Sequence, residues 1–185
     1  MTRNLVAVLC ILAVVGLGCA KLKELGKGGG SAAYKSDKDG FSIQFPSGSE
    51  VKEESADVKW SSSARTYGKS FENRSDNYRS YEVTAAEPLT SVDGKTDKEI
   101  EEIGLNGWED EPETVVKDIT VDGIKALDSV RSVEIGPAKM TFREVPIWSA
   151  KNKKLYVIQV AAVKKENVST KEANDFINSF KILNK

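Results

Sequence analysis

Residues 155–163, with the sequence LYVIQVAAV, are apolar at eight of nine positions. The preceding Lys151-Asn152-Lys153-Lys154 is typical of a turn, so we expect a strand that starts after it. A strand with one exposed face alternates apolar and polar residues, whereas a strand that is apolar on both sides must be covered on both faces. The sequence therefore predicts that 155–163 is the centre of a sheet with a layer packed against each face.

Turn signals before this segment predict a meander. Residues 115–121 alternate apolar and polar side chains up to Asp122-Gly123, a dipeptide typical of two-residue hairpin turns, and 124–135 follows as the partner strand. A Gly-Pro turn then leads into another apolar stretch at 140–148. Because hairpins join antiparallel neighbours, we expect a mainly antiparallel sheet.

Two helices are predicted from capping boxes, in which a Ser or Thr and a Glu three residues later cap each other's backbone N–H. Thr96 and Glu99 form the first, before a short stripe that ends near Trp108. Ser169 and Glu172 form the second. The apolar face of the second helix consists of Ala173, Phe176, Ile177 and Phe180.

The remaining elements complete the expected fold. Residues 41–46 and 81–85 alternate in the manner of strands, and we interpret the polar stretch 57–72 between them as a hairpin. With a doubly covered central strand and two helices, the sequence predicts an α+β fold, a mainly antiparallel sheet flanked by helices on both faces.

The start of the chain predicts export. No charged residue lies between Arg3 and Lys21, and residues 5–18 are almost purely aliphatic. This run is shorter than the roughly 20 apolar residues that a membrane-spanning helix requires. A basic start, an apolar run and small residues at its end are the three parts of a signal peptide, so we assign residues 1–18 to one.

The segment Gly16-Leu17-Gly18-Cys19 resembles a bacterial lipobox, in which the cysteine is lipidated and becomes the mature N-terminus. The usual pattern has leucine three residues before the cysteine, whereas Leu17 is two before it. Cleavage after Ala20 would instead release a soluble protein. We predict lipidation of Cys19 with palmitate-type acyl chains, because residues 21–33 have the composition of a flexible tether.

The expected organisation is therefore a signal peptide, a lipidated cysteine and tether over residues 19–33, and one domain over 34–185. The lipid on Cys19 would bind the domain to a membrane on its extracytoplasmic side, in a bacterial cell envelope. Ala20 stands where inner-membrane lipoproteins of the enteric type have Asp, which favours the outer membrane.

Composition excludes several kinds of chemistry. The chain has no histidine, and both cysteines, Cys10 and Cys19, lie in or next to the leader. Ser-His-Asp and Cys-His catalysis and His/Cys zinc sites are therefore excluded from the domain. Removal of Arg3 with the leader leaves 26 basic and 28 acidic residues, a formal charge of −2 that argues against nucleic-acid binding. We expect no cofactor.

Two segments of the domain resemble the PsbP-type family, which includes the photosystem II extrinsic protein and many small bacterial envelope lipoproteins. They are Tyr34 with GFSIQFP at 40–46, and FINSFK at 176–181. The resemblance covers most of residues 34–183. It implies an antiparallel sheet flanked by helices and a role in binding other proteins, but it assigns no partner-binding residue.

Two groups of residues are candidate sites. Acidic residues at 109–113 offer oxygen ligands for a cation, but they lack the spacing of a calcium loop, and a solvated loop accounts for them. Cations and aromatics alternate at Arg65, Tyr67, Arg79 and Tyr81, as they do on glycan-binding or lipid-binding surfaces. An ordinary sheet face has the same composition.

The sequence thus predicts a non-enzymatic, membrane-tethered module that binds or assembles an unknown envelope protein or ligand. The alternative is a carboxylate-dependent envelope hydrolase or carbohydrate-active domain, which would require two carboxylates that converge in one cleft.

Overall fold

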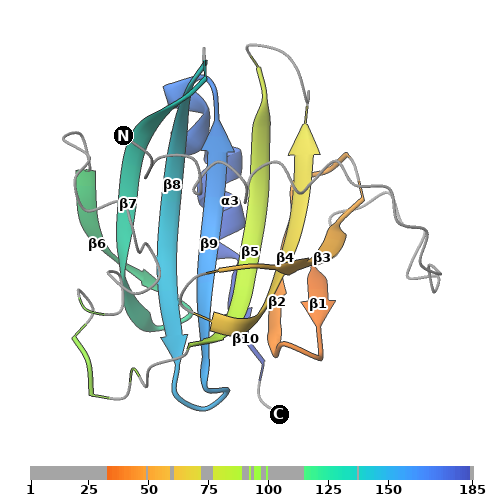
Figure 1. The fold of residues 1–185 in the computed structure, drawn as a ribbon, viewed down its shortest axis with the longest axis vertical. Coiled ribbons are helices and arrows are strands. Elements are labelled where there is room, and N and C mark those ends of the chain that lie inside the picture. The colour runs from red at the N-terminus through yellow and green to blue at the C-terminus, as the bar shows by residue number, and fades with distance from the viewer. Residues whose placement is uncertain are drawn as a thin grey trace.

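The computed structural model describes residues 33–183 except 49, 59–60, 72–76, 89–91, 93, 97–98, 100–114 and 137. Most of the described chain belongs to a seven-stranded sheet of order β3-β4-β5-β9-β8-β7-β6, in which every neighbouring pair is antiparallel (Figure 1). Its strands are β3 (Lys52–Ala56), β4 (Ser61–Phe71), β5 (Arg79–Pro88), β6 (Val115–Val121), β7 (Ile124–Ile135), β8 (Ala138–Ser149) and β9 (Lys154–Ala162).

A second layer, which we call the small layer, packs on one side of this sheet. It contains a three-stranded antiparallel sheet with β2 in its centre, a 3-10 helix and the helix α3, which lies behind the large sheet in Figure 1. These elements are β1 (Tyr34–Ser36), β2 (Phe41–Ile43), β10 (Lys181–Ile182), η2 (Lys165–Ser169) and α3 (Lys171–Asn178). We call the side of the large sheet that contacts them its inner face, and the opposite side its outer face.

Aromatic rings fill the space between the two layers. Tyr81 of β5 lies 5.3 Å from Phe176 of α3, and Tyr156 of β9 lies 5.3 Å from Phe180, measured between ring centroids. The rings of Phe41 and Tyr67 meet edge to face at 5.0 Å. Such pairs contribute about 0.5–1.5 kcal/mol each beyond the burial of their area, so this cluster holds the small layer onto the inner face.

The predicted central strand is confirmed. Strand β9 is the fourth of the seven strands, between β5 and β8. Ile158 and Val160 are buried on its inner face, and Leu155 and Ala161 are buried on its outer face. The predicted meander is confirmed as well: β6, β7, β8 and β9 follow one another as antiparallel neighbours.

The prediction of helices on both faces of the sheet is wrong. The structure is mostly antiparallel strand in two sheets, and among the described residues a single α-helix, α3, packs on the inner face beside the small sheet. The error has a physical reason. Apolar side chains predict that a face is buried, but a helix, a second sheet or neighbouring side chains of the same sheet can bury it; on the outer face, Ala161 packs with Met140 and Phe142 of the same sheet.

The two capping boxes have different outcomes. Thr96 and Glu99 form theirs, because the Thr96 N–H donates to the Glu99 carboxylate at 2.8 Å and the Glu99 N–H donates to Thr96 Oγ1 at 3.3 Å. The rest of that predicted helix lies outside the described residues. Helix α3 is capped by Thr170, whose hydroxyl accepts from the Ala173 N–H at 3.2 Å, instead of by the predicted Ser169. Its predicted apolar face is confirmed, since Ala173, Phe176, Ile177 and Phe180 are buried.

The interpretation of residues 57–72 as a hairpin is also wrong. Most of that stretch is the single strand β4, which pairs with β3 on one side and β5 on the other. Side chains alternate along a strand, so only every second residue of β4, such as Arg65 and Tyr67, points toward the small layer. Polar residues can occupy the positions between them because these positions lie on the other face.

Candidate functional site

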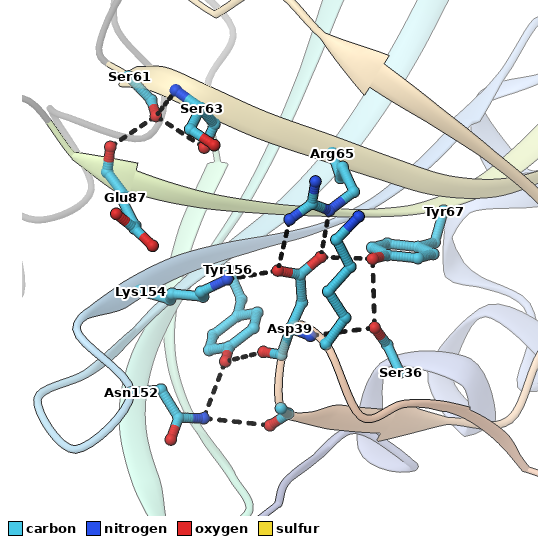
Figure 2. Close-up of polar contacts among 12 residues, drawn as sticks. Ser36, Asp39, Ser61, Ser63, Arg65, Tyr67, Glu87, Asn152, Lys154 and Tyr156 are labelled. Carbon is cyan, nitrogen blue, oxygen red and sulfur yellow. Dashed lines mark hydrogen bonds and ion pairs between the residues drawn. The ribbon is translucent and has the colours of Figure 1, made fainter.

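A polar network around Asp39 joins the two layers (Figure 2). Asp39 lies in the turn between β1 and β2, and its side chain is only 1% exposed. Its carboxylate accepts hydrogen bonds from Arg65 Nε at 2.9 Å, from Tyr67 Oη and from Lys154 Nζ. Strands β4 and β9, which supply these donors, are separated by β5, so the carboxylate ties the turn to both.

The main chain of the same turn is held from β9 and the β8–β9 turn. Tyr156 Oη donates to the Asp39 carbonyl at 2.6 Å, and Asn152 Nδ2 donates to Tyr156 Oη at 3.0 Å and to the Gly40 carbonyl at 3.1 Å (Figure 2). Gly40 has φ of 70°, and a Cβ there would lie 2.7 Å from Asn152 Nδ2. Glycine is therefore required at this position for both its conformation and its close approach.

The contacts in this network shift the pKa values of Asp39 and Tyr67. Burial alone would raise the pKa of Asp39, but the hydrogen bonds from Arg65, Lys154 and Tyr67 outweigh burial and hold that pKa well below 3.8. Burial and the Asp39 carboxylate raise the pKa of Tyr67 well above 10.0. An ionised acceptor surrounded by firm donors is a structural clamp, and it offers neither a free base nor a nucleophile.

The four residues of the predicted binding face lie on this same inner face. Arg65 binds Asp39, and Tyr67 and Tyr81 are fully buried in the core. Tyr81 Oη donates to Glu172 Oε2 at 2.9 Å. Burial, and after it this hydrogen bond, raises the pKa of Tyr81 to about 12. Arg79 lies 5.4 Å over the ring of Phe71. The structure places these four residues on one face, where Arg65, Tyr67 and Tyr81 contact the small layer and Arg79 Nη1 lies 3.9 Å from Glu172 Oε2 of α3.

A second polar group crosses the outer face. Glu82 of β5, Gln159 of β9 and Glu144 of β8 are register partners in one row. Gln159 Nε2 donates to Glu144 Oε1 at 2.6 Å, and Arg131 Nη2 lies 2.5 Å from Glu144 Oε2, with the two charged side chains 2% and 6% exposed. A mid-strand glycine makes room for this row, since a Cβ at Gly68 would lie 2.8 Å from Glu82 Cγ.

Among the described residues, a groove lies at the other end of the sheet. It encloses about 330 Å³ on the inner face between the edge strands and the helical layer. That volume lies at the lower end of the range for small-ligand sites. Its lining residues are Val115, Lys117, Asp128, Val130, Arg143, Ser169 and Asn174.

Arg143 fixes the floor of this groove. Its Nε and Nη2 donate to the two Asp128 oxygens at 2.9 and 2.8 Å, and Nη1 donates to Asn174 Oδ1 at 2.7 Å and to the Val168 carbonyl at 3.2 Å. Both members of the ion pair are about nine-tenths buried. Because the fork of the guanidinium joins β7 to α3 and η2, the groove is preformed.

Val115 and Lys117 of β6 form the rim of the groove. Val115 and Val116 are 49% and 47% exposed, the two large apolar side chains exposed among the residues that the structure describes. Val115 and Lys117 line the groove from β6, and Val116 points to the outer face because side chains alternate along a strand. The groove therefore offers an apolar wall, an ammonium group and the amide of Asn174.

Sequence reasoning missed this groove. Asp128 and Arg143 are charged residues inside strands that otherwise bury apolar side chains, and that was an available signal. Their pairing needed the register of β7 with β8. The acidic run at 109–113 and Cys19 lie outside the described residues. Elsewhere in the described ranges, no three His, Cys, Asp or Glu side chains gather to hold a metal ion, and no described helix has the length and apolar character for a membrane crossing.

Comparison with known proteins gives little more. No protein-family model matches the chain, and no curated protein matches it. A similar solved structure is the "Crystal structure of LpqN involved in cell envelope biogenesis of Mycobacterium tuberculosis", with 12% identity and a TM-score of 0.45 over 83% of this chain and 90% of that one. The PsbP-type resemblance is not confirmed.

Proposed function

We propose that the chain is an exported, membrane-tethered module of the bacterial cell envelope that binds or assembles a partner without catalysis. The observation that carries the proposal is the preformed groove beside β6. Its floor is fixed by the Arg143–Asp128 pair, and its rim exposes Val115. The lining combines two valines with charged and polar side chains, and a concave site with positioned polar groups can orient a ligand or a partner side chain.

The chemistry of the groove favours binding over hydrolysis. A carboxylate-dependent hydrolase needs two carboxylates that face one cleft. Among the described residues that line the groove, Asp128 is the one carboxylate, and both its oxygens accept from Arg143. The groove therefore lacks, among its described lining residues, the second carboxylate that such a hydrolase requires.

The groove is tested by photo-crosslinking in native envelopes. Benzoylphenylalanine replaces Val115 in the full chain, and a matched variant carries it at Lys153, an exposed residue of the β8–β9 turn. We expect one discrete adduct from position 115 that is absent from position 153 and is lost when Ser169→Trp fills the groove. The same adduct from both positions, or none from position 115, would contradict the proposal.

The tether is tested separately. Mass spectrometry of the mature protein should show acyl chains on Cys19 that disappear in a Cys19→Ala variant, and density-gradient fractionation should place the acylated protein with the outer membrane. An unmodified mature protein that begins at Lys21 would show that the leader is cut after Ala20 and that the domain is released.

A further inference from the structure

Strand β6 ends the large sheet at the groove. In the described residues it pairs only with β7, and its seven residues form an uninterrupted ladder from Val115–Val130 to Val121–Ile124. The exposed Val115 and Val116 lie at its start. An exposed edge of this length, with apolar β-branched residues, is a template for another strand.

The turn that follows β6 determines which backbone groups face outward. Asp122 and Gly123 have φ of 52° and 79°, as both central residues of a type I′ turn do, so Val121 and Ile124 form a hydrogen-bonded pair. Such pairs alternate along an antiparallel ladder. The N–H and C=O groups of Val115, Lys117, Ile119 and Val121 therefore face β7. Those of Val116, Asp118 and Thr120 face the open edge.

The two charges of β6 disfavour pairing with a second copy of the chain. If two copies of β6 paired antiparallel about a twofold axis, their inner faces would lie on the same side of the joined sheet. An inner-face residue could then oppose only inner-face residues, and an outer-face residue only outer-face residues. Two registers pair both valines in a ladder of five or more residues. One puts Lys117 opposite Lys117, and the other puts Asp118 opposite Asp118, which is destabilising.

We infer that β6 receives an extended peptide segment of an envelope partner as an added antiparallel strand. The inference rests on the proposed binding function and names the kind of partner. Opposite Lys117 the segment carries an acidic residue, opposite Asp118 a basic one, and opposite Val115 and Val116 apolar ones. Backbone pairing with Val116, Asp118 and Thr120 supplies affinity, and the facing side chains supply specificity.

The groove extends this specificity on the inner face. Val115 and Lys117 belong to both the edge strand and the groove wall. A long side chain of the added strand that lies over Val115 would enter the space above Val130 and Asn174. The edge and the groove therefore form one surface.

A synthetic peptide tests the charge pattern. The probe is the blocked heptapeptide Thr-Thr-Val-Arg-Glu-Val-Val, which in antiparallel register faces residues 121 to 115. Its control, Thr-Thr-Val-Glu-Arg-Val-Val, has the same composition with the charges exchanged. By fluorescence anisotropy with the full chain in detergent, we expect the probe to bind about tenfold more tightly than the control. The double variant Lys117→Glu, Asp118→Lys should invert this preference.

A backbone variant tests the ladder itself. Val116→Pro removes an N–H that faces the open edge and leaves the pairing with β7 intact, as edge strands allow. We expect at least a tenfold loss of probe binding, whereas Val116→Thr, which keeps the N–H and a β-branched side chain, should bind within about threefold of the original chain. Circular dichroism confirms that both variants are folded.

Equal binding of the two peptides, or Val116→Pro that binds like the original chain, would overturn strand addition. If the Val115 adduct still forms in envelopes under either result, the proposed function survives and only the mode of binding is wrong. If the probe binds as expected but no adduct forms, strand addition stands and the envelope role fails.

Discussion

Two carboxyl groups on opposite faces of the same sheet illustrate how differently this fold treats a buried acid. Asp39 contacts the inner face, and its carboxylate accepts hydrogen bonds from Arg65, Lys154 and Tyr67. Glu82 lies in β5 on the outer face, beside Gly68. Burial raises the pKa of Glu82, and the nearby carboxylates of Glu54 and Glu144 raise it further against a hydrogen bond from Ser80. The fold therefore favours the charged form of Asp39 and disfavours the charged form of Glu82.

The comparison shows that hydrogen-bonding partners can reverse the pKa shift that burial alone would cause. Asp39 is almost completely withdrawn from water and Glu82 is partly withdrawn from it, and burial carries a free-energy cost for the charged form of each group. Two cations and a phenol offset this cost at Asp39. At Glu82 the neighbouring carboxylates add to this cost. At neutral pH the ionised Asp39 should therefore stabilise the fold, and a charge on Glu82 should destabilise it.

The largest expected effect is at Asp39. Asp39→Asn removes the shared acceptor of Arg65 and Lys154 and should lower the free energy of unfolding by about 3 kcal/mol, measured by urea denaturation at pH 7. Asp37→Asn is the matched control in the same turn, because Asp37 is 81% exposed and pairs only with Lys35 in the described contacts. It should cost less than about 0.5 kcal/mol. Equal losses would show that the turn, and not the clamp, is being weakened.

The next effect is on acid stability. The pKa of Asp39 is lowered in the folded state, so its contribution is fully present well above 3.8, the value expected in the unfolded chain, and is lost as the pH falls below it. Between about pH 6 and pH 3 the original chain should lose about 1 kcal/mol more than Asp39→Asn. Parallel acid profiles of the two proteins would contradict the assignment of a lowered pKa.

Removing one phenol at a time separates the buried partner from the half-exposed one. Tyr67→Phe deletes a buried donor to Asp39 and should cost about 1.5 kcal/mol, since hydrogen bonds to charged groups are the stronger ones. Tyr81→Phe deletes a donor to Glu172, which is 41% exposed, and should cost about 0.5 kcal/mol. Thermal denaturation of the two variants checks the order, and a reversed order would break the comparison.

The smallest effect has the opposite sign. Glu82→Gln should stabilise the protein by about 1 kcal/mol at neutral pH, because the amide carries no charge to desolvate. The raised pKa means that the native penalty is absent below 4.5 and grows as the pH rises above it, so the gain should vanish near about pH 4. Glu87→Gln, on an exposed residue of the same strand, is the control. A gain that does not change with pH would refute the titration of Glu82.

Local patterns anticipated much of the fold. The apolar run at 155–163, the Asp122-Gly123 turn and the apolar stripe of α3 each depend on residues close together in the sequence, so periodicity and turn chemistry were sufficient. The helices expected on both faces failed because apolar periodicity says that a face is covered and not by what. The site was missed because Arg143 and Asp128 meet only through the pairing of β7 with β8.

Side-chain type and local spacing were sufficient to predict that 155–163 is buried on both sides, that the domain lacks thiol and imidazole chemistry, and where the hairpins turn. The pairing of the charged residues depends on the assembled fold. Asp39 meets Lys154 across 115 positions, and Val115 meets Asn174 across one groove. Such pairings follow from strand order and register, which short-range patterns do not encode.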